Sequence, residues 1–443
     1  MAKAKKNIKF ALMGLGTVGA GVAELLEKNR QLIESRVGAT LELKAALVRD
    51  VKKARAGVPA SVKITTDPDV ILKDPEIDIV IEVMGGFEPA HDYIMRAIDA
   101  GKHVVTANKA VLAKHWDEVF HRAHDKNVDV YIEASVGGGI PCVQAINDGL
   151  AANRIERITA IINGTTNYIL TGMASHGKSF DKALKDAQAK GYAEAEPSFD
   201  IDGMDACHKL AILSSIAFDQ RVRIEDISLQ GIRGITKQDI DIARQEMGCV
   251  VKHLAMARTR GADDALEVQV VPCLLPLDHP LAGVDGVNNG VLVKGDAVGE
   301  VLFSGRGAGK MPTASAVISD LIFVARNVAV GVAGRVPAIP YDVEKVQSRK
   351  IVALDDIQNR FFIRVTAVDQ PGVLAAIARV LADHSISISS VAQNEKEKGS
   401  TVPVYISTYR ATEKAVREAV AALERLAAVK PGTLVLRLEV PEA

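Results

Sequence analysis

The feature that most constrains the fold is a glycine motif between an apolar strand pattern and a helical pattern near the N-terminus. The apolar run Ile8–Met13 is followed by Gly14-Leu15-Gly16-Thr17-Val18-Gly19. In a dinucleotide-binding βαβ unit the first glycine permits the tight turn, the second lets the backbone approach the pyrophosphate, and the third lets helix and strand pack closely. The phosphate binds at the helix N-terminus. The motif predicts a nucleotide site, with a purely structural turn as the alternative.

The first third of the chain continues this alternation of short apolar runs and helical patterns, which is typical of a parallel sheet. The predicted helices include Val18–Lys28 and Tyr93–Ala100. The predicted strands are Ile8–Met13, Leu41–Val48, Ile79–Val83, His103–Thr106 and Val128–Ala134. Glycine or polar residues follow several of these strands at the sheet edge where ligands bind in open α/β sheets. These patterns predict a Rossmann-type α/β domain.

Composition narrows the class of protein further. The 443 residues correspond to about three domains. Lys and Arg total 54 against 55 Asp and Glu, and this balance argues against a nucleic-acid binder. Four cysteines without a C-x-x-C pair indicate neither a disulfide scaffold nor a cysteine-bound zinc or iron–sulfur centre. A short basic N-terminus without an apolar h-region, and no run of 18 apolar residues, predict a cytoplasmic protein without membrane association.

The remainder of the chain is predicted to form two further domains. Residues 137–305 mix helices with strands, which predicts an α+β substrate-binding and dimerisation domain; the elements are Arg157–Ile162, Asp181–Lys190, Asp205–Phe218 and Leu266–Pro272. Residues 331–354 are predicted to be a linker, and residues 306–330 to return to the nucleotide domain of residues 1–136. Residues 355–443 show the order βαββαβ of a ferredoxin-like unit. Its second helix is predicted over Ala411–Ala428.

The residues at the end of the second predicted strand indicate whether the cofactor ribose carries a 2′-phosphate or a 2′-hydroxyl. Arg49 there would accommodate the 2′-phosphate of NADP, whereas Asp50 would bind the 2′-hydroxyl of NAD. Lys52, Lys53 and Arg55 add positive charge, although such a run is also typical of a solvated surface. The pattern favours NADP and leaves NAD open.

Two lysines are candidates for proton transfer. Lys109 follows a strand at the edge that carries the glycine motif, where it could orient or protonate a substrate oxygen; the alternative is a solvated side chain. Lys209 lies four residues after Asp205 in an apolar helical pattern. A lysine buried in such a helix needs a partner or a lowered pKa, and both suit proton transfer. The alternative is an ordinary salt bridge with Asp205.

Three glycine-rich or polar turns are further candidates. The run Glu133–Pro141 ends a predicted strand in three glycines and is either a ligand-binding turn or a flexible hinge. The segment Asn163–Asn167 is predicted to turn from a strand into a helix with exposed hydrogen-bond donors. The segment Gly305–Gly309 precedes an alanine-rich helix and suggests a second approach of the backbone to the cofactor.

Taken together, these segments resemble the homoserine dehydrogenase family. The resemblance rests on Gly14–Gly19, Ala107–Lys109, Glu133–Pro141, Asn163–Tyr168 and, most specifically, Gly191–Lys209. Residues 361–440 resemble an ACT regulatory domain, with Asp369–Leu374 in its ligand loop. The resemblance covers nearly the whole chain and implies NAD(P)-dependent interconversion of L-homoserine and L-aspartate 4-semialdehyde, in threonine, isoleucine and methionine biosynthesis.

The resemblance also implies roles for individual residues. Lys209 would exchange the proton at the C4 oxygen, and Lys109 would serve substrate and nicotinamide. The substrate ligands would be Glu194, Asp200 and Asp205. The cofactor contacts would be Gly14, Gly16, Thr17, Val18, Gly19, Arg49, Lys109, Gly191 and Gly309. A sodium ion would be held by Glu133, Val136, Gly138 and Ile140 through backbone oxygens.

Regulation by an amino acid and assembly into a homo-oligomer are also expected. Threonine is expected to bind the ACT region near Asp369–Leu374 and inhibit, although an ACT-like unit can serve dimerisation only. The homo-oligomer is expected to be a dimer or a tetramer. Two other functions are retained as alternatives: another NAD(P)-dependent oxidoreductase of the aspartate family, and an inactive amino-acid sensor.

Overall fold

The computed structural model describes residues 5–53, 57–261, 263–337, 339, 349–393 and 401–439. Arg55 and residues 338 and 340–348 of the expected linker lie outside these ranges. The chain forms two compact units. Unit 1 comprises Met1–Ile158, His208–Glu225 and Asn288–Ser348, and unit 2 comprises Thr159–Cys207, Asp226–Val287 and Arg349–Ala443.

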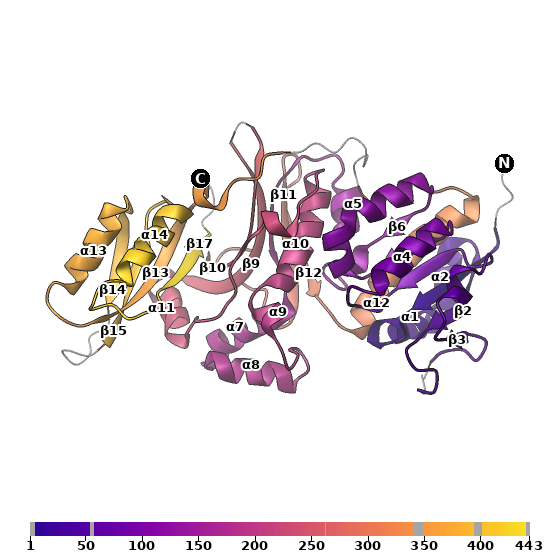
Figure 1. The fold of residues 1–443 in the computed structure, drawn as a ribbon, viewed down its shortest axis with the longest axis horizontal. Coiled ribbons are helices and arrows are strands. Elements are labelled where there is room, and N and C mark those ends of the chain that lie inside the picture. The colour runs from indigo at the N-terminus through magenta and orange to yellow at the C-terminus, as the bar shows by residue number, and fades with distance from the viewer. Residues whose placement is uncertain are drawn as a thin grey trace. The chain divides into compact units, whose positions relative to one another are not determined.

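Unit 1 is built on a six-stranded parallel sheet with the order β3-β2-β1-β4-β5-β6 (Figure 1). The strands are β1 (Asn7–Met13), β2 (Thr40–Leu47), β3 (Lys63–Thr65), β4 (Ile79–Glu82), β5 (His103–Thr106) and β6 (Val130–Tyr131). The strands run outward in both directions from β1, as in a doubly wound nucleotide-binding sheet. The predicted Rossmann-type α/β fold is therefore confirmed.

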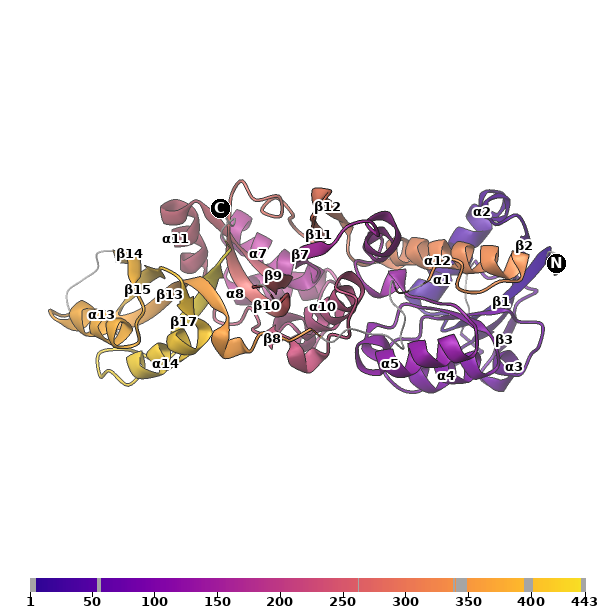
Figure 2. The ribbon, with the colours of Figure 1, turned by 90° about the horizontal axis from the view of Figure 1, so that it is seen from above.

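Helices cover both faces of this sheet, and α1, α2 and α12 lie side by side on one of them (Figures 1 and 2). The helices are α1 (Thr17–Lys28), α2 (Arg30–Val37), α3 (Asp69–Leu72), α4 (Ala90–Asp99), α5 (Lys109–Asp125) and α12 (Lys310–Val330). Among the residues described, α12 is the one helix long and apolar enough to cross a membrane. Its side chains Val317 and Leu321 instead share a core with Phe10 and Leu12 of β1, so α12 is a core helix of unit 1.

After β6 the chain departs from the predicted strand Val128–Ala134. Residues Glu133–Ser135 form a 3-10 turn, which leads to α6 (Cys142–Gln144) and a π-helical turn at Ala145–Gly149. The buried Glu133 explains the change, because its backbone N–H donates to the Asp320 carboxylate at 2.9 Å. Its own carboxylate accepts from the N–H groups of Val143 at 3.0 Å and Gln144 at 2.7 Å, so the chain must fold back on itself. Unit 1 also contains the hairpin of β11 (Asn288–Gly295) and β12 (Gly299–Arg306).

Unit 2 is organised around the long antiparallel pair β9 (Cys249–Arg260) and β10 (Ala265–Pro276). Residues of α7 and α11 share an apolar core with β9 and β10. The helices of this region are α7 (Gly164–His176), α8 (Phe180–Ala189), α9 (Ser198–Ile201) and α11 (Lys237–Met247). The helix α10 (Met204–Ala217) begins in unit 2 and continues into unit 1 from His208. The short strand β8 (Ser228–Leu229) pairs with β10, and β7 (Ile155–Ile161) precedes α7. The predicted strand and helix positions in this part of the chain agree with these bounds to within a few residues.

The C-terminal part of unit 2 is the predicted ferredoxin-like unit. Its elements are β13 (Gln358–Val368), α13 (Val373–Asp383), β14 (Ile388–Gln393), β15 (Thr401–Thr408), β16 (Ala411–Thr412), α14 (Glu413–Leu423) and β17 (Leu434–Leu438). The strand order is β17-β13-β15-β14. The predicted helix Ala411–Ala428 is shorter, because Thr412 caps α14 by accepting a hydrogen bond from Ala415 N at 3.1 Å.

The last strand of this unit also joins the sheet of the preceding region. β17 pairs in parallel with β10 through Cys273–Arg437 and Leu274–Leu438. Buried Arg258 of β9 makes polar contacts across the junction: its guanidinium lies 3.5 Å from the Glu439 carboxylate and donates to Asn359 Oδ1 at 3.2 Å. The ferredoxin-like unit and the β9–β10 pair therefore form one continuous sheet.

Candidate active site and effector pocket

The three motif glycines of the first loop have different steric surroundings. Gly14 has a φ of +103°, and a Cβ there would lie 2.8 Å from the Val83 carbonyl oxygen. A Cβ on Gly19 would lie 2.2 Å from the Gly14 carbonyl oxygen. By contrast, no described atom lies within 4 Å of a Cβ built on Gly16. Gly14 and Gly19 are thus required by the fold itself, whereas Gly16 leaves space that a ligand can use.

This loop opens onto a cavity of about 630 Å³ within unit 1. The residues lining it include Gly14, Gly16, Val48, Arg49, Asp50, Lys53, Glu88 and Tyr93. Thr17 and Val18 begin α1, and no described side chain caps that helix terminus. Free N–H groups and the helix dipole there favour a phosphate. The size of the cavity, its open glycine and the Arg49 and Lys53 side chains on its rim fit a dinucleotide.

The ends of β4 and β5 are held together by a buried carboxylate. Glu82 accepts from the Thr106 hydroxyl at 2.6 Å and from Met84 N at 2.8 Å, and burial raises the pKa of Glu82. Asn108 caps α5 by accepting from Val111 N at 3.3 Å, and its amide donates to Gly86 O at 2.8 Å. Lys109 is the first residue of α5 and partly buried. Its backbone is therefore positioned at the carboxyl edge of the sheet, as predicted.

In unit 2 a single amide joins two of the predicted substrate ligands. Asn163 Nδ2 donates to Asp200 Oδ1 at 2.7 Å and to Asp205 Oδ2 at 2.8 Å. Its Oδ1 accepts from Thr166 N at 2.8 Å, which caps α7. Asp205 is only 4% exposed and Asp200 is partly buried. The predicted strand-to-helix turn at Asn163 thus holds two carboxylates together although they lie on different helices.

Two further groups shape this carboxylate cluster. Thr165 Oγ1 lies 3.2 Å from Asp200 Oδ2 and donates to Tyr192 O at 2.7 Å, which links the cluster to the segment after α8. Gln188 Nε2 donates to the carbonyl oxygen of Glu194 at 3.0 Å. The Glu194 side chain is exposed and therefore accessible to a ligand. Gly191, in the same segment, has a φ of +72°.

Lys209 differs from the sequence-based expectation in one respect. The helix α10 is buried over most of its length, with Leu210, Ala211, Ile212 and Leu213 completely inaccessible. Lys209 itself, however, is only partly buried. The prediction of a buried lysine was wrong, because Lys209 and His208 lie on the part of the helix surface that the core does not cover.

The glycine run after Glu133 packs against the turn before α12, within unit 1. Gly138 has a φ of +60°, and a Cβ there would lie 2.4 Å from Gly307 O. Gly139 N donates to Arg306 O at 3.1 Å. This backbone-to-backbone contact argues against a flexible hinge and brings the two predicted glycine turns together. Gly309, with a φ of +127°, ends the second turn.

The oxygen atoms of the first turn suit a hard cation. Backbone carbonyls of Glu133, Val136, Gly138 and Ile140 offer neutral oxygen donors, which is the chemistry that such ions prefer. The Ile140 carbonyl accepts from Cys142 N at 2.8 Å, but each carbonyl has two lone pairs. The donor set is therefore compatible with a monovalent cation.

Two residues that support this turn, Asp320 and Gln144, were not singled out from the sequence. Asp320 of α12 accepts from Glu133 N and, at 2.9 Å, from the Gln144 amide. Burial, together with the nearby Glu133 carboxylate, raises the pKa of Asp320 well above its ordinary value, and burial also raises the pKa of Glu133 to about 7. The signal in the sequence that could have identified Asp320 is its position as an acidic residue within the apolar pattern of α12.

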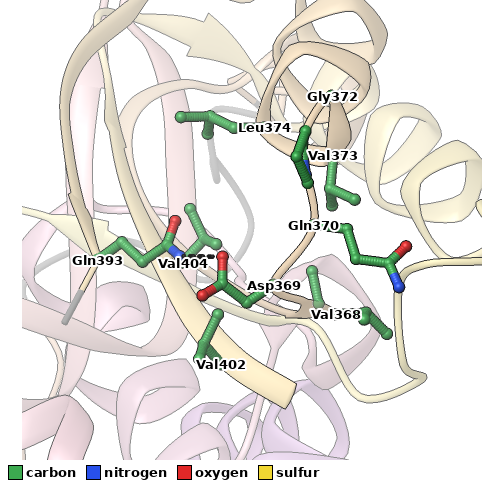
Figure 3. Close-up of a pocket in the computed structure, with 11 residues that line it drawn as sticks. Val368, Asp369, Gln370, Gly372, Val373, Leu374, Gln393, Val402 and Val404 are labelled. Carbon is green, nitrogen blue, oxygen red and sulfur yellow. Dashed lines mark hydrogen bonds between the residues drawn. The ribbon is translucent and has the colours of Figure 1, made fainter. Parts of the chain in front are cut away.

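A second cavity, of about 420 Å³, lies in the ferredoxin-like unit (Figure 3). Its lining includes the complete loop Asp369–Leu374 together with Gln393, Val402 and Val404. Gln393 Nε2 donates to Asp369 Oδ1 at 3.3 Å, and Figure 3 shows the two side chains pointing toward each other. Within this loop Gly372, with a φ of +89°, directly precedes α13, whose first two residues are Val373 and Leu374. The predicted ligand loop therefore borders a pocket large enough for an amino acid.

Family models match three segments of the chain. Residues 14–133 match the homoserine dehydrogenase NAD-binding domain, residues 141–322 match homoserine dehydrogenase, and residues 361–428 match the ACT domain. The homoserine dehydrogenase of Pseudomonas aeruginosa is 41% identical over 436 residues, which is 98% of this chain and 99% of that protein. The homoserine dehydrogenase of a Synechocystis strain is 42% identical over 98% of this chain and 99% of that protein.

This chain is also similar to solved structures. The crystal structure of a homoserine dehydrogenase from Thiobacillus denitrificans has a TM-score of 0.92 at 44% identity, covering 99% of both chains. A hyperthermophilic archaeal homoserine dehydrogenase in complex with NADPH has a TM-score of 0.60 at 28% identity, covering 72% of this chain and 97% of that one.

Proposed function

The chain belongs to the homoserine dehydrogenase family, and from that premise we propose how its residues carry out the reaction. The reaction is the NAD(P)-dependent interconversion of L-homoserine and L-aspartate 4-semialdehyde. The observation that carries the proposal is the Asn163 amide, which holds Asp200 and Asp205 within one hydrogen-bonded cluster.

Substrate binding is assigned to the carboxylates. Asp205, Asp200 and Glu194 bind the polar groups of homoserine, and their negative charge selects its ammonium group. Asn163 keeps the two aspartates oriented, so the substrate does not have to order them on binding. Fixing the amino end of the substrate aligns the C4 atom for reaction.

Proton transfer is assigned to the lysines. When bound, the nicotinamide cofactor supplies or accepts the hydride. Lys209 gives a proton to the C4 oxygen in the reductive direction and takes it back in the oxidative direction. Lys109 orients the substrate oxygen beside the nicotinamide. The partial exposure of Lys209 supports this role, because a proton must reach it from water.

Cofactor binding is assigned to the glycine loop and to basic side chains on the rim of its cavity. Gly14, Gly16, Thr17, Val18 and Gly19 bind the pyrophosphate, and Gly191 and Gly309 make further contacts. Arg49, which with Lys53 lines the cavity, selects NADP over NAD through its 2′-phosphate. The carbonyl oxygens of Glu133, Val136, Gly138 and Ile140 hold a sodium ion, which stabilises the packed glycine turns.

Regulation is assigned to the ACT pocket. Threonine binds against Asp369–Leu374, where the Asp369 carboxylate pairs with its ammonium group, and inhibits the enzyme. The enzyme is a cytoplasmic homo-oligomer on the route to threonine, isoleucine and methionine. Its domains are 1–136 with 306–330 for the nucleotide, 137–305 for substrate and dimerisation, and 355–443 for regulation, after the linker 331–354.

Steady-state kinetics of homoserine oxidation test these assignments. The full chain is assayed with NADP and with NAD, in the presence and absence of threonine. Arg49→Ala should raise the KM for NADP by about tenfold and leave that for NAD unchanged, since one charged hydrogen bond is lost. Asp369→Asn should abolish threonine inhibition without changing kcat. An equal rise in the KM for NADP and for NAD in Arg49→Ala would refute the role of Arg49 in cofactor selection. Full threonine inhibition in Asp369→Asn would refute the role of Asp369 in effector binding.

A further inference from the structure

A cluster of two histidines and a glutamate lies outside every role assigned above. His91 comes from α4, and His115 and Glu118 come from α5, all within unit 1. One potential ligand atom from each residue lies within 4.8 Å of the other two. Two imidazoles and one carboxylate are a donor set that catalytic zinc sites use, with a fourth position open to water.

The distances within the cluster are close to those of a coordination shell. Glu118 Oε2 lies 3.1 Å from His91 Nε2 and 2.9 Å from His115 Nδ1. With zinc–ligand distances of roughly 2.0–2.1 Å, neighbouring donors in a tetrahedral site lie about 3.3 Å apart. A small outward movement of the Glu118 carboxylate therefore makes room for an ion between the three groups.

The surroundings orient the ligands. Glu88 Oε1 lies 3.3 Å from His91 Nδ1, which leaves His91 Nε2 directed at Glu118. A carboxylate on the second ring nitrogen is a common partner of metal-bound histidine. The imidazoles are stacked with centroids 3.9 Å apart and planes 26° apart, and Phe87 packs against both. Because a metal ion lies in the plane of each ligating imidazole, one ring must tilt out of this stack when the ion binds. The side chains are only 15% and 23% exposed, so the neighbouring residues limit how far either ring can move.

The backbone of α5 contributes to this arrangement. His115 has φ and ψ of −112° and 27°, values that interrupt the helix at this residue. Residues three apart lie on one face of a helix, so the spacing already brings His115 and Glu118 together, and the interruption falls at His115 itself. The third ligand, His91, comes from the neighbouring helix α4.

We propose that His91, His115 and Glu118 bind one divalent ion of the zinc class, with Glu88 orienting His91. Imidazole nitrogens and a carboxylate favour Zn²⁺ or Co²⁺ over Mg²⁺ or Ca²⁺, which prefer all-oxygen sites. The ion links α4 to α5. Because Glu88 also lines the cofactor cavity, it anchors one wall of that cavity as well.

Titration of the chelator-treated, full-length protein with ZnCl₂ tests the proposal by calorimetry. The wild type should bind one Zn²⁺ per chain. Glu118→Gln and His91→Gln should each weaken binding by more than tenfold, and Glu88→Gln by about 10–100-fold, as expected for an orienting partner. His124→Gln is the matched control, because His124 is an exposed residue of the same helix outside the cluster. Its binding should equal that of the wild type.

A second measurement separates this site from the cysteines. Co²⁺ bound by nitrogen and oxygen donors gives visible bands without a thiolate charge-transfer band. Binding that is unchanged in Glu118→Gln and His91→Gln, a thiolate band, or a wild type that takes up no stoichiometric Zn²⁺ would each overturn the proposal. The two variants alter half-exposed or partly exposed side chains, and circular dichroism confirms that they are folded.

Discussion

The nucleotide pocket of unit 1 and the carboxylate cluster of unit 2 are built in opposite ways. At the pocket, the contiguous loop Gly14–Gly16 contributes backbone atoms and, at Gly16, the space left by an absent side chain. The cluster is formed by side chains from separate elements that converge on Asn163. A backbone site depends on whether a Cβ fits, whereas a side-chain site depends on partners that are distant in the sequence. Four predictions test this contrast.

The largest effect is expected at Lys209, the residue proposed to transfer the proton. Lys209→Ala should lower kcat by about 10²–10⁴-fold, because general acid–base catalysis contributes that much. Cofactor affinity, measured by the quenching of protein fluorescence on NADPH titration, should stay within about twofold, since the glycine loop is untouched. Lys185→Ala on α8 serves as the control. Near-normal turnover in Lys209→Ala would remove the proton-transfer assignment.

The second prediction concerns the side-chain cluster. Asn163→Ser should lower kcat/KM for homoserine by about 10–100-fold, because hydrogen bonds to charged groups contribute about 1.5–3 kcal/mol. Serine still caps α7, so the Tm should remain close to that of the wild type. Thr165→Val, which removes one contact with Asp200, should have a smaller effect. A kinetic loss confined to the cofactor KM would contradict the substrate-binding role.

The third prediction compares two glycines of the same loop. Gly19→Ala should destabilise the protein by about 1–3 kcal/mol or more, because its Cβ would overlap the Gly14 carbonyl. Gly16→Ala should leave the Tm unchanged, since no described atom lies within 4 Å of the new Cβ. It should nevertheless raise the KM for the cofactor, as the methyl group occupies ligand space. Equal Tm values for the two variants would show that the loop is not restrained as described.

The smallest effect appears only on acidification and concerns unit 2. Burial lowers the pKa of His253 from 6.5 to about 4, with its Nε2 beside Gln230 O at 2.9 Å. As the pH falls from 6.5 to 4, His253 therefore becomes protonated in the unfolded chain while it stays neutral in the native state. The free energy of unfolding decreases as the pH falls through this window. The loss is about 2 kcal/mol at pH 5. His253→Gln should show a flatter urea midpoint between pH 7 and 5; an unchanged slope would exclude His253 as the cause.

Predictions from the sequence were most accurate where the requirement is local. The Gly14–Gly19 loop was recognised because turn geometry and strand–helix contact depend on adjacent residues. The loop Asp369–Leu374 was assigned from the resemblance to an ACT domain, and it borders a cavity as a contiguous segment. The predicted strands β1, β4 and β5 match the structure to within one residue because continuous apolar runs define them.

The errors have a common physical origin. The predicted strand Val128–Ala134 ends early because Glu133 is bonded to Asp320, far along the chain. The exposure of Lys209 depends on which part of α10 the core covers. The pairing of β17 with β10 also joins residues that no periodicity relates. Each of these outcomes is decided by a contact between distant segments.

The amino-acid sequence by itself determined the family, the nucleotide loop and the types of side chain available for catalysis. Local backbone sterics and apolar patterning are sufficient for the nucleotide loop, since they act over a few residues, whereas the family was indicated by the resemblance of contiguous motifs. Only the tertiary structure decided that one amide joins Asp200 to Asp205, that Asp320 supports the turn at Glu133, and that His91 meets His115 and Glu118. Hydrogen bonds and coordination require atoms within about 3 Å, and only the folded chain brings distant residues that close.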